Sequence, residues 1–170
     1  MKWYIQAIKQ YATFTGRTSR QGYWMFILFN VLFSFCASIL DKLFGTEAGN
    51  TGVLSMLYSL FILVPSYAIS VRRLHDIGKS GMLLLAVIIA TIIVTLFFIF
   101  FVLVRVMTGG MDSLSGADGG IFFVCILYYI AVSIWLLVLY CRKGTPGVNK
   151  YGPNPEEPEE TGYDTMGESI

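Results

Sequence analysis

The residues of this chain that could do chemistry gather in one short stretch, residues 71–81, which reads VRRLHDIGKSG. It holds the single histidine of the chain, His75, directly before Asp76. Three basic side chains accompany them: Arg72, Arg73 and Lys79. Arginines beside a histidine and a carboxylate form a set of residues that can bind a phosphate and transfer a proton.

A structural role competes with catalysis for this stretch. Neighbouring side chains on a helix diverge, so His75 next to Asp76 in the sequence does not make a catalytic dyad. Nucleotide binding is excluded, because a P-loop needs glycine where Arg73 stands. In the structural interpretation Asp76 pairs with an arginine, Gly78 turns the chain and Ser80 caps the next helix. We therefore expect no catalytic residue, and a lipid-modifying enzyme that uses His75 and Asp76 is the weakest hypothesis.

Two further stretches carry similar residues. Residues 14–24 (FTGRTSRQGYW) place Arg17 and Arg20 before an apolar run, where they can hold lipid phosphates or pair with acids in other loops. Residues 142–155 (RKGTPGVNKYGPNP) are rich in turn formers, which predicts a defined loop folded back on the cytoplasmic face, where Val148 and Tyr151 can pack. The candidate residues for binding lipid or a partner are Arg17, Arg20, Arg72, Arg73, His75, Asp76, Lys79, Asn149 and Tyr151.

Membrane-spanning helices must position these stretches. Of the 170 residues, 55% are hydrophobic and 14% charged, whereas a soluble domain is about a quarter charged. Four apolar runs are long enough to cross a hydrocarbon core of about 30 Å as helices. None contains Asp, Glu, Lys, Arg or His. The expected spans are residues 23–40, 53–71, 82–104 and 121–140.

The predicted fold is therefore an all-α integral membrane protein with four transmembrane helices in a single membrane domain, residues 1–152. Aromatic side chains and two lysines in residues 1–15 indicate an additional helix that can lie in the membrane interface. Prolines and glutamates in residues 153–170 predict a disordered acidic tail. The three cysteines lie in or at the end of apolar runs and are expected to be reduced thiols. With one histidine and no CxxC pair, we expect no metal site and no cofactor.

The distribution of basic residues predicts the orientation. Of the 12 lysines and arginines, all but Lys42 and Arg105 lie in the N-terminal segment, the loop between the second and third spans, or the C-terminal segment. Cytoplasmic loops carry such an excess of basic residues. We therefore expect both termini, and all three motif stretches, on the cytoplasmic side.

At these three stretches the chain resembles a known family. The matching pieces are Trp3-Tyr4, FTGR with Arg20 and Tyr23-Trp24, RRLHD with Gly78 and Ser80-Gly81, and GTPG followed by NKYGPNP. They resemble the small bacterial inner-membrane proteins of the YhaH type, grouped as domain of unknown function 805, over residues 3–155. Met82 departs from the family pattern, which tends to have tryptophan there. The resemblance implies a multi-helix fold in a bacterial inner membrane, encoded by a bacterium or a phage, and it implies no activity.

Two functions remain open beside the enzyme. The first is a non-enzymatic scaffold or module that binds anionic lipid headgroups, a membrane-protein partner or a second copy of the chain at its cytoplasmic face. The alternative is a subunit of a transporter, flippase or channel, motivated by the four spans and by serines around Pro65. Proton-coupled transport normally needs an ionisable residue at depth, which these spans lack. We expect no nucleic-acid partner.

Overall fold

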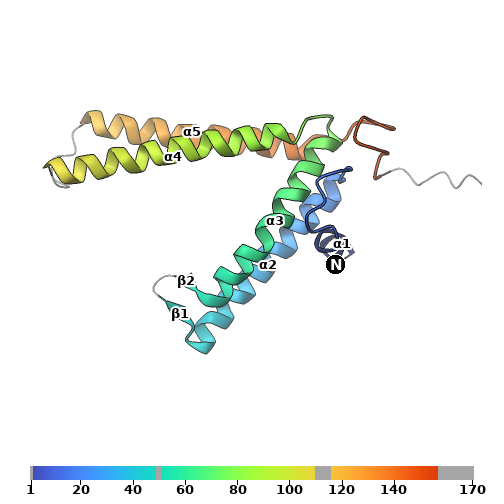
Figure 1. The fold of residues 1–170 in the computed structure, drawn as a ribbon, viewed down its shortest axis with the longest axis horizontal. Coiled ribbons are helices and arrows are strands. Elements are labelled where there is room, and N and C mark those ends of the chain that lie inside the picture. Colours follow the sequence, from blue (N-terminus) through green and yellow to red (C-terminus); the bar gives the residue numbers. More distant parts are fainter. Residues whose placement is uncertain (1, 49–50, 110–115, 157–170) are drawn as a thin grey trace, which may run out of the picture. The chain divides into compact units, whose positions relative to one another are not determined.

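Four long helices dominate the computed structural model, which describes residues 2–48, 51–109 and 116–156 (Figure 1). They are α2 (Arg20–Phe44), α3 (Val53–Asp76), α4 (Met82–Gly109) and α5 (Gly116–Cys141). All four are long and apolar enough to cross a membrane. The prediction of an all-α membrane protein with four transmembrane helices is confirmed.

The helices run past the apolar segments, because capping and polar contacts fix where each one ends. The α2 helix begins at Arg20, where the Ser19 hydroxyl accepts a hydrogen bond from the Gly22 amide (3.1 Å). Arg17 precedes this helix. The α3 helix continues to Asp76, so the RRLHD motif is helical and belongs to the last turns of α3.

The chain forms two compact units. The first contains a short N-terminal helix, α1 (Lys2–Lys9), the α2 and α3 helices, and the segment that begins at Gly144. In it, α2 and α3 lie side by side as an antiparallel pair, joined through two short antiparallel strands, β1 (Glu47–Ala48) and β2 (Thr51–Gly52) (Figure 1). The second unit runs from Lys79 to Lys143 and contains α4 and α5.

The α1 helix forms within the segment predicted to be interfacial, although it ends at Lys9 and not at Thr15. Its aromatic side faces the α2–α3 pair. The Tyr4 ring stacks on Phe26 (5.6 Å between centroids), and the Tyr4 hydroxyl is hydrogen-bonded to the Tyr58 hydroxyl (3.2 Å). Both lysines of α1 are exposed. This arrangement, with rings towards the bundle and ammonium groups outward, is typical of an interfacial helix.

The opposite end of the α2–α3 pair is closed by Asp41, which is 1% exposed. Its carboxylate accepts hydrogen bonds from the amides of Leu54 (2.9 Å) and Ser55 (2.8 Å) in the first turn of α3. The Thr46 and Ser55 hydroxyls also donate to it (2.6 and 2.7 Å). Because the N-cap of α3 is Gly52, which has no side chain to accept these bonds, Asp41 supplies the cap from another helix.

The second unit is held together by polar contacts between two apolar helices. The Thr95 and Tyr129 hydroxyls are hydrogen-bonded (2.8 Å), and Arg105 Nε donates to Asp118 Oδ1 (2.8 Å). Large apolar side chains on both helices are exposed. Lipid can solvate such surfaces, and interhelical hydrogen bonds are a usual means of association in a bilayer.

The best-packed part of the first unit lies at the end that carries the motif stretches. Phe26, Ala68, Arg73 and Leu74 are 0% exposed. Further along the helix pair, apolar side chains such as Phe35 are 65% exposed. The motif-bearing end is therefore packed like a soluble core, while the remainder of the pair presents its apolar surface outward.

Candidate functional site

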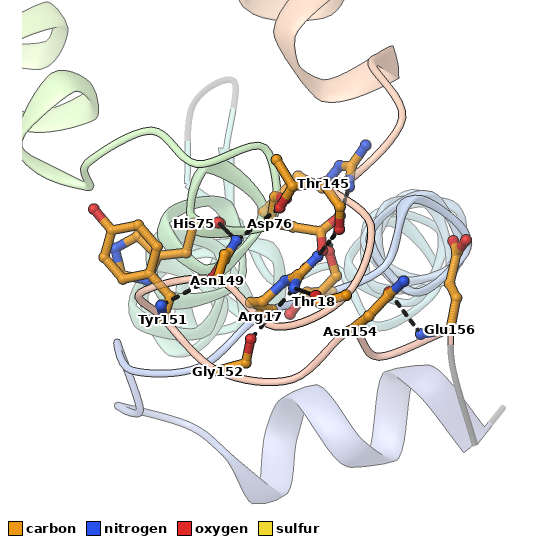
Figure 2. A network of polar contacts seen from close by, with 12 residues as sticks. Arg17, Thr18, His75, Asp76, Thr145, Asn149, Tyr151, Gly152, Asn154 and Glu156 are labelled. Atoms are coloured by element: carbon orange, nitrogen blue, oxygen red, sulfur yellow. Dashed lines mark hydrogen bonds and ion pairs between the residues drawn. The ribbon is translucent and has the colours of Figure 1, made fainter. Parts of the chain in front are cut away.

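The three motif stretches fold together at one end of the first unit. We call this region the cap, formed by residues 14–24, 71–78 and 144–156. Figure 2 shows its polar contacts. The backbone amide of Thr145 donates to the carbonyl of Asp76 (2.9 Å), and the Thr18 amide donates to the Arg72 carbonyl (3.2 Å). The predicted fold-back of the C-terminal loop is thus present, and it lies against the end of α3.

Arg17 connects all three stretches. Its Nε donates to Asp76 Oδ1 (3.0 Å) and its Nη2 donates to the Thr145 carbonyl (2.6 Å). Its Nη1 donates to the carbonyls of Gly147 (2.7 Å) and Gly152 (3.3 Å). The Arg17 side chain is 1% exposed. Every nitrogen of its guanidinium group is therefore engaged: Nη1 and Nη2 hold the C-terminal loop, and Nε holds Asp76 at the end of α3 (Figure 2).

Asp76 shares its carboxylate between two arginines. Oδ1 accepts from Arg17, and Oδ2 forms an ion pair with Arg73, three residues earlier on α3. The Asp76 side chain is 3% exposed. A Cβ atom at Gly144 would lie 2.3 Å from Oδ2, so only glycine lets the C-terminal loop pass this close. A carboxylate enclosed in this way stabilises the cap and has no open side for a substrate.

His75 is held by stacking and by backbone contacts. Its ring lies parallel to that of Tyr151 (3.8 Å between centroids, 4° between planes). Nδ1 lies 3.3 Å from the Gly16 carbonyl, and because a carbonyl only accepts, Nδ1 is the protonated nitrogen in this hydrogen bond. Asn149 Nδ2 donates to the His75 carbonyl (3.0 Å), and the Tyr151 amide donates to Asn149 Oδ1 (2.8 Å). His75, Asn149 and Tyr151 therefore support one another inside the cap.

The other candidate residues are placed differently. Arg72 is 4% exposed, and its Nη1 donates to Gln10 Oε1. Arg20 is exposed at the start of α2. Lys79 is exposed and belongs to the second unit. Val148, which was expected to pack, is 79% exposed, so that prediction is wrong.

Sequence reasoning missed the acceptors of the cap, because backbone carbonyls leave no mark in a sequence. The carbonyls of Thr145, Gly147 and Gly152 surround the Arg17 guanidinium. The sequence did carry an indirect signal, the glycines at positions 147 and 152. In the structure their φ angles are 62° and 128°, which other residues rarely adopt. These glycines allow the loop to turn its carbonyls inward.

The cap therefore offers buried arginines and enclosed backbone acceptors. Within the described part of the chain, no group of three or more His, Cys, Asp or Glu side chains could hold a metal ion. Residues 153–156 of the expected tail lie in the cap, with the Glu156 amide donating to Asn154 Oδ1 (3.1 Å). The rest of the expected tail, residues 157–170, lies outside the described residues.

The chain is similar to known proteins over most of its length, including the cap. The family model "Protein of unknown function (DUF805)" matches residues 11–153, which include nearly all of the cap. The chain is 32% identical to the inner membrane protein YhaH of Escherichia coli strain K12 over 159 residues, covering 92% of this chain and 98% of the relative. It is 31% identical to the inner membrane protein YhaI of the same strain over 156 residues, covering 92% and 97%. No solved structure matches the chain.

Proposed function

Because this chain belongs to the DUF805 family and is an inner membrane protein, we propose that it is a non-enzymatic membrane module that binds anionic lipid headgroups at the cytoplasmic surface. The proposal depends on how the basic side chains of the first unit divide. Arg17 and Arg73 are buried and share Asp76. Five other basic side chains of this unit are exposed and form no ion pair with a described residue. One of them, Lys42, lies near the far end of α2, whereas the other four lie in α1 and the cap: Lys2, Lys9, Arg20 and Lys150.

The exposed group is suited to a negatively charged membrane surface. Each lysine or arginine near an anionic leaflet contributes about 1 kcal/mol, so four together contribute about 4 kcal/mol before screening. The lysines of α1 flank Trp3 and Tyr4, and rings of this kind prefer the headgroup region. Within the cap, the Lys150 ammonium group lies over the Tyr151 ring (5.0 Å to the centroid).

The geometry of His75 and Asp76 favours binding over catalysis. The Asp76 carboxylate is occupied by two arginines. One face of the His75 ring is covered by the Tyr151 ring, which lies parallel to it. Moving a proton to or from a substrate needs a group that can approach the reacting atom within hydrogen-bond distance. The enclosed Asp76 carboxylate does not meet this requirement.

Two of the serines that motivated a transporter subunit donate their hydroxyl protons within their own helix, α3. The Ser59 hydroxyl donates to the Ser55 carbonyl, and the Ser70 hydroxyl donates to the Ser66 carbonyl, both at 2.7 Å. A hydroxyl bonded in this way has no proton left to donate to a substrate along a polar path. This supports the lipid-binding proposal over transport by this chain.

Retention of lipid by the purified protein tests the proposal. The full chain would be extracted in mild detergent from membranes that contain phosphatidylglycerol and phosphatidylethanolamine, and bound lipid would be counted by native mass spectrometry. We expect phosphatidylglycerol to be enriched among the retained lipids. Replacing all four exposed basic residues with glutamine should reduce that enrichment at least tenfold, because about 4 kcal/mol of attraction is removed.

The matched control is Lys42→Gln, which removes an exposed positive charge near the far end of α2. Its phosphatidylglycerol retention should resemble that of the unaltered chain, whereas Arg20→Gln alone should lower it measurably. Equal retention by the fourfold variant and the unaltered chain would refute lipid binding through these residues. A stoichiometric copurifying protein lost from the fourfold variant would indicate a protein partner instead.

A further inference from the structure

A cavity of about 70 Å³ lies beside the cap, between α1, the start of α2 and the last turns of α3. Trp3, Ser19, Gly22 and Arg72 are among the residues that line it. A single water molecule requires about 10–15 Å³ by this measure, so the cavity has room for a group several times larger. The exposed residue Gln6 also lines it, which gives the cavity access to the surface.

Arg72, one of the residues that line this cavity, has a hydrogen-bond donor that is not used. The residue is 4% exposed. Its Nε donates to the Ala68 carbonyl (3.4 Å) and its Nη1 donates to Gln10 Oε1. Within residues 2–48, 51–109 and 116–156, its Nη2 is buried and has no hydrogen-bond partner. Buried arginine donors are ordinarily satisfied, so an unpaired one indicates a missing acceptor.

The surroundings select an acceptor with negative charge. The described lining includes two arginines, Arg17 and Arg72, and no carboxylate. Asp76 is engaged by Arg17 and Arg73. The hydrogen-bond acceptors of Arg72, the Ala68 carbonyl and the Gln10 side-chain oxygen, are both neutral. The α2 helix also begins here, and its N-terminal end attracts anions. The Ser19 oxygen accepts from the Gly22 amide, which leaves the Ser19 O–H available as a second donor.

We propose that this cavity binds a phosphate group, with Arg72 Nη2 and the Ser19 hydroxyl as its donors. Arginine is well suited to phosphate because its donors form a rigid planar fork. The phosphate can come from a lipid headgroup or from a free phosphate in the cytoplasm. For the lipid source, the inference rests on the proposed function, since it gives the headgroup a defined pocket in addition to the exposed basic surface.

Fluorescence of Trp3 provides a direct readout, because its indole lines the cavity. The full chain with Trp24→Phe and Trp135→Phe, purified in neutral detergent, retains Trp3 alone among its 3 tryptophans. It would be titrated separately with inorganic phosphate, with dihexanoyl phosphatidate and with dihexanoylglycerol, which has the same chains and no phosphate. We expect a saturable change with at least one phosphate-bearing probe and none with dihexanoylglycerol.

Two variants test the site by different means. Arg72→Gln removes the charge and the free donor, and should weaken binding at least tenfold. Gly22→Ala adds a Cβ atom 3.1 Å from the Trp3 ring and 3.3 Å from Ser19 Oγ, so it should weaken binding by narrowing the cavity. Alanine favours the helix over glycine, so this variant should fold even where Arg72→Gln does not. Arg105→Gln, in the second unit, is the control and should leave the response unchanged.

Each pattern of response decides something. A response to phosphatidate alone assigns the site to a lipid headgroup, a response to inorganic phosphate alone assigns it to free phosphate, and a response to both supports the site with either source. No response to either probe, or a response unaltered by Gly22→Ala, overturns the proposal. The variant lacking the four exposed basic residues separates the two hypotheses. If this variant retains lipid normally and Trp3 still responds to phosphate, the proposed function fails and the cavity stands. If the variant loses lipid, and Trp3 of the unaltered chain does not respond to phosphate, only the cavity is refuted.

Discussion

Replacing Arg17 with glutamine should open the cap while leaving the four membrane helices folded. The guanidinium group holds the C-terminal loop through the carbonyls of Thr145, Gly147 and Gly152, and glutamine is too short and has too few donors to replace it. Asp76 would lose one of its two arginines. The helix pair itself is held by other contacts, including Tyr58 to Asn30 Oδ1 (2.7 Å).

The size of this effect follows from the burial of the pair. Arg17 and Asp76 are 1% and 3% exposed, and breaking a buried ion pair by removing one partner costs about 3–5 kcal/mol. Arg73 still neutralises Asp76, so we expect the lower end, about 3 kcal/mol. Since each 1.4 kcal/mol is a factor of ten, opening of the cap should become roughly a hundred times more frequent.

Hydrogen exchange of individual amides measures this opening. The Thr145 amide is bonded to the Asp76 carbonyl, and the Asn149 and Gly152 amides are bonded to one another's carbonyls. These amides should exchange roughly a hundredfold faster in Arg17→Gln, while amides in the middle of α2 and α3 should be unaffected.

Arg20→Gln is the matched control, because Arg20 is exposed and three residues away. Its cap amides should exchange within a few-fold of the unaltered chain. The reasoning fails if Arg17→Gln leaves exchange of the cap amides within that same range. A double-mutant cycle with Asp76→Asn should give a coupling of about 1–3 kcal/mol between the two side chains.

Three other predictions concern the loops and the orientation. Gly144→Ala should displace the Asp76 carboxylate, because the new Cβ would lie 2.3 Å from Oδ2, and should accelerate exchange of the cap amides at least tenfold. Gly52→Ala places a Cβ atom 2.0 Å from the Asp41 carboxylate that caps α3, and should lower the thermal unfolding midpoint by several degrees. In a chain whose other two cysteines are replaced by serine, exposed Cys141 should react with a membrane-impermeant maleimide in inside-out vesicles and be protected in intact spheroplasts.

Each of these has a control within the chain. Gly120→Ala tests the glycine predictions, since a Cβ atom there meets nothing within 4 Å and the variant should be as stable as the unaltered chain. An unchanged midpoint in Gly52→Ala would contradict the capping role given to Asp41. For orientation, a cysteine at exposed Lys42 should show the opposite accessibility to Cys141. Labelling of Cys141 from outside intact spheroplasts would reverse the expected topology.

The sequence could predict the membrane helices because hydropathy acts locally. A run of about 20 apolar residues without charge is stable across a bilayer whatever surrounds it, so residues 82–104 identify α4 with no knowledge of its neighbours. Because hydropathy is local, it also predicted the wrong helix ends: the second span was expected to end at residue 71, whereas α3 ends at Asp76. Four of the five residues 72–76 are polar or charged, so hydropathy does not extend the predicted span over them. In the structure α3 continues to Asp76, where contacts with distant segments hold its last turn.

The candidate residues illustrate the same distinction. Their chemical types showed that Arg17, Arg72 and Asp76 matter, since charged residues beside a membrane need partners or water. Nothing in the sequence could separate Arg72 from Arg73, which stand side by side in the RRLHD motif. In the folded chain Arg73 pairs with Asp76, while Arg72 retains an unpaired nitrogen beside a cavity.

By itself, then, the sequence determined the class of protein, its four spans, the clustering of its polar motifs and its family. Only the tertiary structure decided which polar residues hold the fold and which retain unused binding capacity. The physical reason is the range of the forces involved. Partition into lipid depends on the composition of a short segment, whereas the partner of a buried arginine is set by segments such as residues 17 and 147, which lie far apart in the chain and meet only when it folds.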